Sequence, residues 1–234
     1  MQSLVAALRY LTFWGRLAPK PQGATRAPPA LYFPFMGLLL GLLLALSNYA
    51  LSLYLDSGLL SILLIGLLVL ATGASHFDGA KNTFDGLFLS ARAQVNSETR
   101  TLGSLLLILM ILLKIRAVEV IDEKIALSLL LAPAFARWTL VVFIFGCREW
   151  CEETSRWVAD NLRLWHLLLT TVAILGLAYY FLARKGLLIG LCLSVFALIT
   201  RSILHRRYSV IRGDNFGAVT ECSETLSLIL LASL

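Results

Sequence analysis

The chain has 234 residues, of which 59% are hydrophobic and 15% are charged, and its formal net charge is +6. An ordinary soluble domain carries about 25% charged residues, so this composition excludes a typical soluble enzyme or binding module. Long apolar runs account for the excess and predict one all-α integral membrane domain over residues 1–234.

The N-terminal stretch predicts an amphipathic helix that lies at the membrane interface. Arg9 interrupts its apolar run, and Trp14 and Arg16 near residue 17 suit the headgroup region. No cleavage site typical of a secretory signal follows. The next segment, to about residue 30, contains four prolines and is expected to be a loop.

Seven apolar runs follow in chain order, each close to the roughly 20 residues that cross a bilayer as a helix. A polar segment at 76–100, a charged loop at 148–163 and a basic stretch at 205–212 separate some of them. The expected transmembrane helices cover residues 31–55, 58–75, 102–120, 125–146, 164–183, 186–204 and about 213–234.

The distribution of lysine and arginine predicts the orientation. With the N-terminus in the cytoplasm, 14 basic residues lie on the inner side and 5 on the outer side, and Arg137 within a span completes the 20. The outer five are Lys114, Arg116, Lys124, Arg184 and Lys185. We therefore expect a multi-pass protein of the cell inner membrane. Its positive charge indicates contact with anionic membrane lipid and not with nucleic acid.

The first polar motif, at residues 76–86, reads HFDGAKNTFDG. In a helix, Asp78, Asn82 and Asp85 are spaced i, i+4 and i+7 and share one face. Two carboxylates and an amide oxygen on one face suit a hard cation such as Mg²⁺. The same Asp-Gly pairs also fit a polar loop whose aspartates cap helices, and the sequence leaves this alternative open.

The second polar motif, at residues 213–224, reads GDNFGAVTECSE. Asp214, Glu221 and Glu224 lie at i, i+7 and i+10, on one helical face that also contains Gly217. An apolar run follows directly, so the glutamates lie at or below the membrane interface and require a cation or an arginine. In the alternative, Asp214 is a helix cap and the glutamates are solvated.

Glycines and one arginine complete the candidate site. Gly79, Gly86 and Gly217 would let a ligand or a helix approach closely. Arg137 lies in the middle of the expected span 125–146, where an arginine usually faces a partner or a polar cavity. It would either hold a phosphate bidentately or neutralise one of the carboxylates. Since both motifs fall on the predicted inner side, we expect the site on the cytoplasmic face.

Together these motifs resemble the signatures of the cobalamin synthase (adenosylcobinamide-GDP ribazoletransferase) family. The family patterns read H-x-D-G-L-A-D-T-x-D-G near the second span and G-D-T-x-G-A-x-x-E-x-x-E near the C-terminus. Weaker matches at residues 8–12 and 32–41 extend the resemblance over nearly the whole chain. The chain looks like a divergent member, because Asn82 replaces an aspartate and only Glu98-Thr99-Arg100 and Gly103 remain of a D-S-R-x-G-x-x-G stretch.

The resemblance implies a Mg²⁺-dependent phosphotransferase. It would join α-ribazole or its phosphate to adenosylcobinamide-GDP, releasing GMP and giving adenosylcobalamin or its phosphate. The catalytic residues expected are Asp78, Asp85, Asp214 and Glu221. The metal ligands expected are Asp78, Asn82, Asp85, Asp214, Glu221 and Glu224. The substrate contacts expected are Arg137, Arg100, His76, Gly79, Gly86 and Gly217.

Two other classes of function remain open from the sequence. A catalytically weakened relative could act as a membrane scaffold that binds enzymes of the same pathway, and Asn82 favours this alternative. Intramembrane charges would also serve a solute transporter, although the spans show no internal repeat. Candidate protein partners are a second copy of the chain and the pathway enzymes.

Overall fold

The computed structural model describes residues 2–12, 28–88, 101–121 and 124–233. Within these ranges all regular structure is helical, apart from one isolated bridge between Cys151 and Ile211. The helices are α1 (Gln2–Leu11), η2 (Pro29–Tyr32), α2 (Phe33–Leu51), α3 (Ser57–Thr72), α4 (Ser75–Phe88), α5 (Leu102–Val120), α6 (Ile125–Ile144), η4 (Arg148–Trp150), α7 (Glu153–Ala159), α8 (Leu164–Leu182), α9 (Arg184–Arg207) and α10 (Gly213–Ser233).

The prediction of a polytopic all-α membrane protein is confirmed. Each of the seven expected spans corresponds to one helix: α2, α3, α5, α6, α8, α9 and α10. Length and apolarity alone identify five spans in the described residues, which contain α2, α6, α8, α9 and α10. A sixth arises if α3 and α4, bent by 90°, form one broken span. The α5 helix is apolar enough to be a further span, and it is not among these five because it contains three charged residues, Lys114, Arg116 and Glu119.

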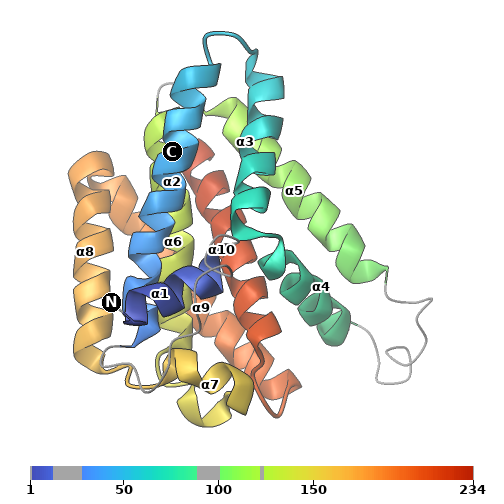
Figure 1. Cartoon of the computed structure of the whole chain (residues 1–234), viewed down its shortest axis with the longest axis vertical. Helices are drawn as coiled ribbons and strands as arrows, with labels where there is room; N and C mark the ends of the chain where they lie inside the picture. Colours follow the sequence, from blue (N-terminus) through green and yellow to red (C-terminus); the bar gives the residue numbers. More distant parts are fainter. Residues whose placement is uncertain (1, 13–27, 89–100, 122–123, 234) are drawn as a thin grey trace.

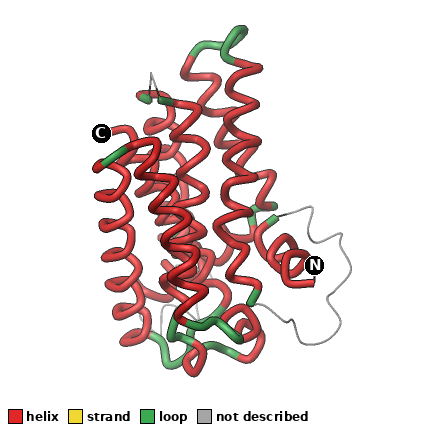
Figure 2. Tube along the Cα trace, turned by 90° about the vertical axis from the view of Figure 1, so that its left-hand side faces the viewer, coloured by secondary structure: helices red, strands yellow, loops and turns green. Residues whose placement is uncertain are grey.

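The helices form an elongated bundle around α6 and α10 (Figures 1 and 2). Figure 1 shows α8 on one side of these two helices and α3 and α5 on the other. Most residues of α6 are buried, whereas α8 and α9 expose most of their apolar surface. Apolarity does not distinguish α6 from α8, because lipid accommodates both; α6 differs in its intramembrane Arg137, which has to be kept away from lipid.

Both polar motifs lie at the same end of the bundle. The first forms α4 and the second begins α10, and these two helices are in extensive contact. In Figure 1, α1, α4, α7 and the first turn of α10 lie toward the end opposite the C-terminus. The two motifs, which the sequence predicted on one side of the membrane, are thus in direct contact in the structure.

Glycines allow the most extensive helix contact among the described residues, which joins α2 to α6. A methyl group built on Gly37 would lie 2.5 Å from the Pro133 carbonyl oxygen, and one on Gly41 would overlap the Leu130 backbone. Small residues at such positions let two membrane helices pack backbone to backbone. Within this pair, α6 is also in extensive contact with α10.

We expect Gly41→Ala to lower the free energy of unfolding by about 1–3 kcal/mol, because the added methyl overlaps the Leu130 backbone. Gly66→Ala in α3 is the matched control, since no atom lies within 4 Å of a methyl built there. Unfolding by SDS titration in mixed micelles measures both variants. Equal stability of the two would contradict the close α2–α6 contact.

Candidate active site

Two glycines bring the polar motifs together. A methyl group built on Gly79 of α4 would lie 2.8 Å from the Asp214 carbonyl oxygen, and one on Gly217 of α10 would lie 2.8 Å from the His76 carbonyl oxygen. Each helix thus places a glycine against the backbone of the other. Of the two approaches that the sequence allowed at Gly79 and Gly217, ligand or helix, the structure shows a helix.

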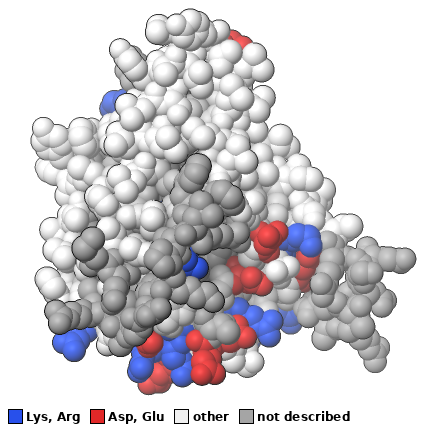
Figure 3. All heavy atoms as spheres, viewed as in Figure 1, with Lys and Arg blue, Asp and Glu red and all other residues white. Residues whose placement is uncertain are grey.

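A polar cleft of about 280 Å³ opens where the C-terminal half of α4 meets the start of α10. Figure 3 shows charged side chains gathered at this end of the molecule, whereas the upper part of the same face is largely uncharged. The residues that line the cleft are Asn82, Thr83, Asp85, Gly86, Tyr208, Arg212, Asp214 and Asn215. Four of them were expected from the sequence as ligands of a metal or a substrate: Asn82, Asp85, Gly86 and Asp214.

Asp85 is buried and has two distinct oxygens. Its Oδ1 accepts a hydrogen bond of 2.8 Å from the Gly103 backbone N–H, and so caps the first turn of α5. Its Oδ2 has no hydrogen-bond partner in the described part of the chain, and the Lys81 Nζ lies 3.8 Å from it. The alternative in which this aspartate caps a helix is therefore correct for one oxygen, and the other is buried near Lys81 and accepts no hydrogen bond among the described residues.

Asp214 lies opposite Asp85 at the start of α10, and it is held by an amide. The Asn82 Nδ2 donates a hydrogen bond of 3.1 Å to Asp214 Oδ2. An aspartate at position 82, as in the family signature, could not donate this bond and would repel Asp214. Asn82 therefore orients the carboxylate of Asp214 when no cation lies between them.

Further hydrogen bonds fix the wall of the cleft. The Asn215 Nδ2 donates to Thr83 Oγ1 over 3.1 Å, and the Tyr208 hydroxyl donates to the Thr83 carbonyl oxygen over 3.0 Å. Burial raises the pKa of Tyr208, and the nearby Arg207 and Arg212 only partly oppose this effect. The phenol therefore stays protonated at neutral pH and keeps its hydrogen bond.

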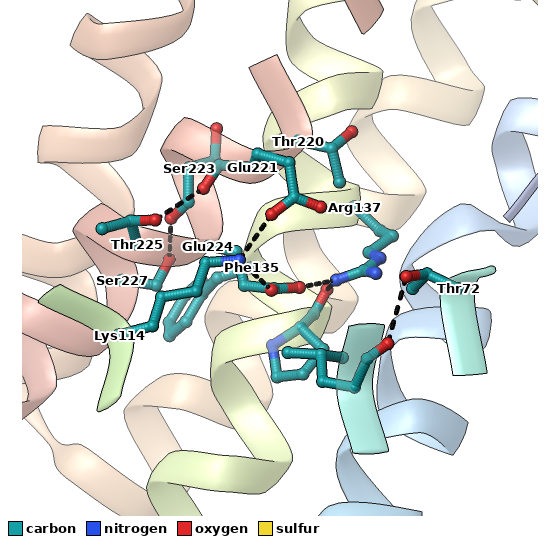
Figure 4. A network of polar contacts seen from close by, with 12 residues as sticks. Thr72, Lys114, Phe135, Arg137, Thr220, Glu221, Ser223, Glu224, Thr225 and Ser227 are labelled. Atoms are coloured by element: carbon teal, nitrogen blue, oxygen red, sulfur yellow. Dashed lines mark hydrogen bonds and ion pairs between the residues drawn. The ribbon is translucent and has the colours of Figure 1, made fainter. Parts of the chain in front are cut away.

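The two glutamates of the second motif lie deeper, in a buried network of four charges (Figure 4). The Lys114 Nζ is 2.6 Å from Glu221 Oε2 and 2.6 Å from Glu224 Oε1. Arg137 donates from Nη1 to the other oxygen of Glu224. None of the four side chains is more than 3% exposed. We refer to Lys114, Arg137, Glu221 and Glu224 as the charge tetrad, and its formal charge is zero.

The tetrad resolves the alternatives for Arg137. The structure shows it neutralising a carboxylate, Glu224, and it does not line the cleft, where a phosphate contact would be needed. The tetrad also corrects the placement of Lys114. The charge tally put Lys114 at an outer membrane end, but its side chain is 1% exposed in the interior. A lysine within an apolar run was the signal that could have identified it.

Three residues that the sequence analysis expected at the site remain to be placed: Asp78, His76 and Arg100. Asp78 is exposed on α4, one turn before Asn82, and does not line the cleft. His76 is buried beside the ring of Tyr10, with ring centroids 6.1 Å apart. Arg100 lies outside the described residues. Sequence reasoning missed Arg212, which lines the cleft two residues before Asp214.

Comparison with known proteins identifies one family. The model of the family described as cobalamin-5-phosphate synthase matches residues 3–232. The adenosylcobinamide-GDP ribazoletransferase of Geotalea daltonii is 32% identical over 220 residues, covering 87% of this chain and 85% of that protein. The enzymes of that name from Thermoanaerobacter sp. (strain X514) and Alkaliphilus metalliredigens are 28% and 26% identical, over 87% and 99% of this chain and 86% and 95% of theirs. No solved structure matches the chain.

We expect Lys114→Met to lower the free energy of unfolding by about 3–5 kcal/mol, because it leaves a buried carboxylate without its cation. Arg116→Met is the matched control on the same helix. Its ion pair with Glu119 is exposed, so we expect a loss of at most about 1 kcal/mol.

The double variant Lys114→Met/Glu221→Gln tests the charge argument directly. It leaves Glu224 paired with Arg137 and should recover much of the lost stability, as measured by SDS titration. If Lys114→Met were as stable as Arg116→Met, the tetrad would not hold α10 in place.

Proposed function

The chain belongs to the cobalamin-5-phosphate synthase family, and we propose that its reaction takes place in the cleft between α4 and α10. The enzyme is a transferase that joins α-ribazole or its phosphate to adenosylcobinamide-GDP. A ribose hydroxyl of α-ribazole attacks the phosphorus bound to the cobinamide. The bond from that phosphorus to the oxygen of GMP breaks, so GMP leaves and the hydroxyl proton passes to a base.

The observation that carries this proposal is the buried Asp85 oxygen that accepts no hydrogen bond among the described residues, in the wall of a cleft that Asp214 also lines. In the described residues no three His, Cys, Asp or Glu side chains gather closely enough to hold a metal ion alone. Mg²⁺ usually takes only one or two protein carboxylates and completes its shell with water and substrate phosphate oxygens. Asp85 and Asp214 therefore fit a Mg²⁺ ion that binds together with a pyrophosphate.

We assign the ion to Asp85 and Asp214, with the amide oxygen of Asn82 as a further candidate ligand and without Asp78, which does not line the cleft. When bound, Mg²⁺ neutralises charge on the phosphoryl group that is transferred. Arg212 lines the same cleft and is the guanidinium that we assign to the pyrophosphate, in place of Arg137.

We also assign Asp214 as the general base that accepts the proton of the attacking hydroxyl. It is partly exposed at the cleft, and Asn82 orients its carboxylate by donating to one oxygen. Lys81 lies beside Asp85 and is one-third exposed, so its ammonium can neutralise an incoming phosphate. The protein residues thus bind the anion, orient the attacking hydroxyl and accept its proton.

Glu221 and Glu224 do not fit the catalytic and metal roles expected from the sequence, and we propose a structural role instead. Glu221 follows Asp214 by seven residues, which is about 10 Å along a helix. Two cations that act on one phosphoryl group lie only about 3.5–4 Å apart. Three of the four carboxylate oxygens of these glutamates are also bonded to Lys114 or Arg137.

We further propose that the cleft lies on the cytoplasmic side of the cell inner membrane, with the N-terminus on the same side. The support is the lysine and arginine distribution. With Lys114 in the interior, the outer side has four basic residues against 14 on the inner side.

GMP release from adenosylcobinamide-GDP, α-ribazole phosphate and Mg²⁺ tests the assignment with the purified protein in liposomes. We expect Asp214→Asn and Asp85→Asn each to lower the rate by at least about 100-fold. Asparagine still accepts the hydrogen bond from Asn82 at position 214 or from Gly103 at position 85, so both variants should fold. EDTA should abolish turnover of the unmodified protein.

Glu149→Gln, at an exposed carboxylate outside the cleft, is the control and should retain full activity. Unchanged turnover in Asp214→Asn and Asp85→Asn would move the reaction away from this cleft. Absence of turnover in the unmodified protein, beside an active relative, would instead favour the scaffold alternative.

Asn82 stands where the family signature has an aspartate, and this difference yields a separate prediction about Mg²⁺ binding. Asn82→Asp adds a carboxylate next to Asp214, so the cleft should bind Mg²⁺ more tightly. We expect the half-activating Mg²⁺ concentration to fall by a factor of about five to ten, as measured by GMP release. An unchanged or higher Mg²⁺ requirement would exclude position 82 from the cation site.

A further inference from the structure

Two adjoining hollows lie along the last turns of α9, away from the cleft. One, of about 400 Å³, is lined by Phe145, Gly146, Trp150, Arg201, Ser202 and His205. The other, of about 320 Å³, is lined by Leu198, Ile199, Ser202, Ile203 and Arg206. Ser202 borders both hollows, and we refer to the two together as the α9 groove. It shares no residue with the lining of the catalytic cleft.

Arg201 is the unusual member of this groove. From Arg184 to Arg206, α9 rises about 33 Å, close to the roughly 30 Å thickness of the hydrocarbon layer. Arg206 therefore lies near one membrane surface, and Arg201 lies about 8 Å deeper. Arg201 donates a hydrogen bond of 2.5 Å to the Phe145 carbonyl oxygen at the end of α6. In the described part of the chain no carboxylate forms an ion pair with it.

An arginine below the membrane surface requires an anionic or polar partner, and here the described residues supply the Phe145 carbonyl oxygen and the Cys147 thiol but no carboxylate. Arg206 adds a second positive charge one turn nearer the surface, and it too has no carboxylate partner among the described residues. The ring of His205 stacks on Trp150, with centroids 4.1 Å apart. Tryptophan and basic side chains together are typical of the headgroup level.

The deeper part of the groove is apolar. Leu198, Ile199 and Ile203 are 46%, 54% and 50% exposed along one face of α9. The groove thus changes along the helix axis from exposed aliphatic side chains to two guanidinium groups and a hydroxyl. A ligand that fits this gradient has a hydrocarbon chain at one end and a phosphate at the other.

We propose that the α9 groove binds one anionic phospholipid. Its phosphate lies between Arg201, Ser202 and Arg206, and an acyl chain follows Leu198, Ile199 and Ile203. Basic pockets between membrane helices are known to hold anionic headgroups. The lipid would join the end of α6 to α9 through Arg201, which already bonds to Phe145.

Native mass spectrometry of the full chain in detergent tests the proposal, with phosphatidylglycerol and phosphatidylcholine of identical acyl chains as probes. We expect phosphatidylglycerol to bind at least about fivefold more tightly than phosphatidylcholine. Arg206→Gln and Arg201→Gln should each weaken phosphatidylglycerol binding by about fivefold. Arg206→Gln tests the charge with less effect on the fold, because Arg201 also donates a hydrogen bond to the Phe145 carbonyl oxygen.

Arg184→Gln is the matched control, because it removes the same charge at the opposite end of the same helix and should leave binding unchanged. Inorganic phosphate at millimolar concentration should not displace the lipid, because it lacks the chain. The proposal is overturned by equal binding of the two lipids, by an equal loss in Arg184→Gln, or by displacement with phosphate alone.

Discussion

The fold depends on the neutralisation of two glutamates in the interior of a membrane protein. Glu221 and Glu224 come from α10, Lys114 from α5 and Arg137 from α6, so three helices must meet for the charges to cancel. Buried charges without partners are strongly unfavourable, and removal of any one member leaves such a charge. The tetrad therefore fixes the rotation of α10 about its own axis.

That rotation determines what the rest of the same face does. Asp214, Gly217, Glu221 and Glu224 share one face of α10, so when the glutamates point inward, Gly217 faces α4 and Asp214 reaches the cleft. The reciprocal close contact of Gly79 with α10 then places the first motif beside the second. In the function that we propose, one helix face thus supports the structure through Glu221 and Glu224 and the chemistry through Asp214, and the glutamates cannot replace the aspartate.

The sequence was sufficient for the helices and for placing the two motifs on one side of the membrane domain, because periodicity and hydropathy report which face and which depth a residue occupies. They do not report the partner across a helix contact. Lys114 therefore looked like a residue of the outer surface, the glutamates looked like metal ligands, and Arg137 fitted two roles equally well. Arg212 carried no local signal, since a basic residue near a membrane surface is ordinary. Asp85 shows the same limit, because only the fold reveals that one of its oxygens caps α5.

The central claim is that the cation and the pyrophosphate bind between Asp85 and Asp214, while the tetrad remains closed. Electron cryo-microscopy of the protein in nanodiscs with Mg²⁺ and adenosylcobinamide-GDP tests this most directly. We expect density for the ion and the pyrophosphate next to Asp85, Asp214 and Arg212, with Lys114 still between the two glutamates. Metal density at Glu221 and Glu224 with Lys114 displaced would contradict the division of roles along α10.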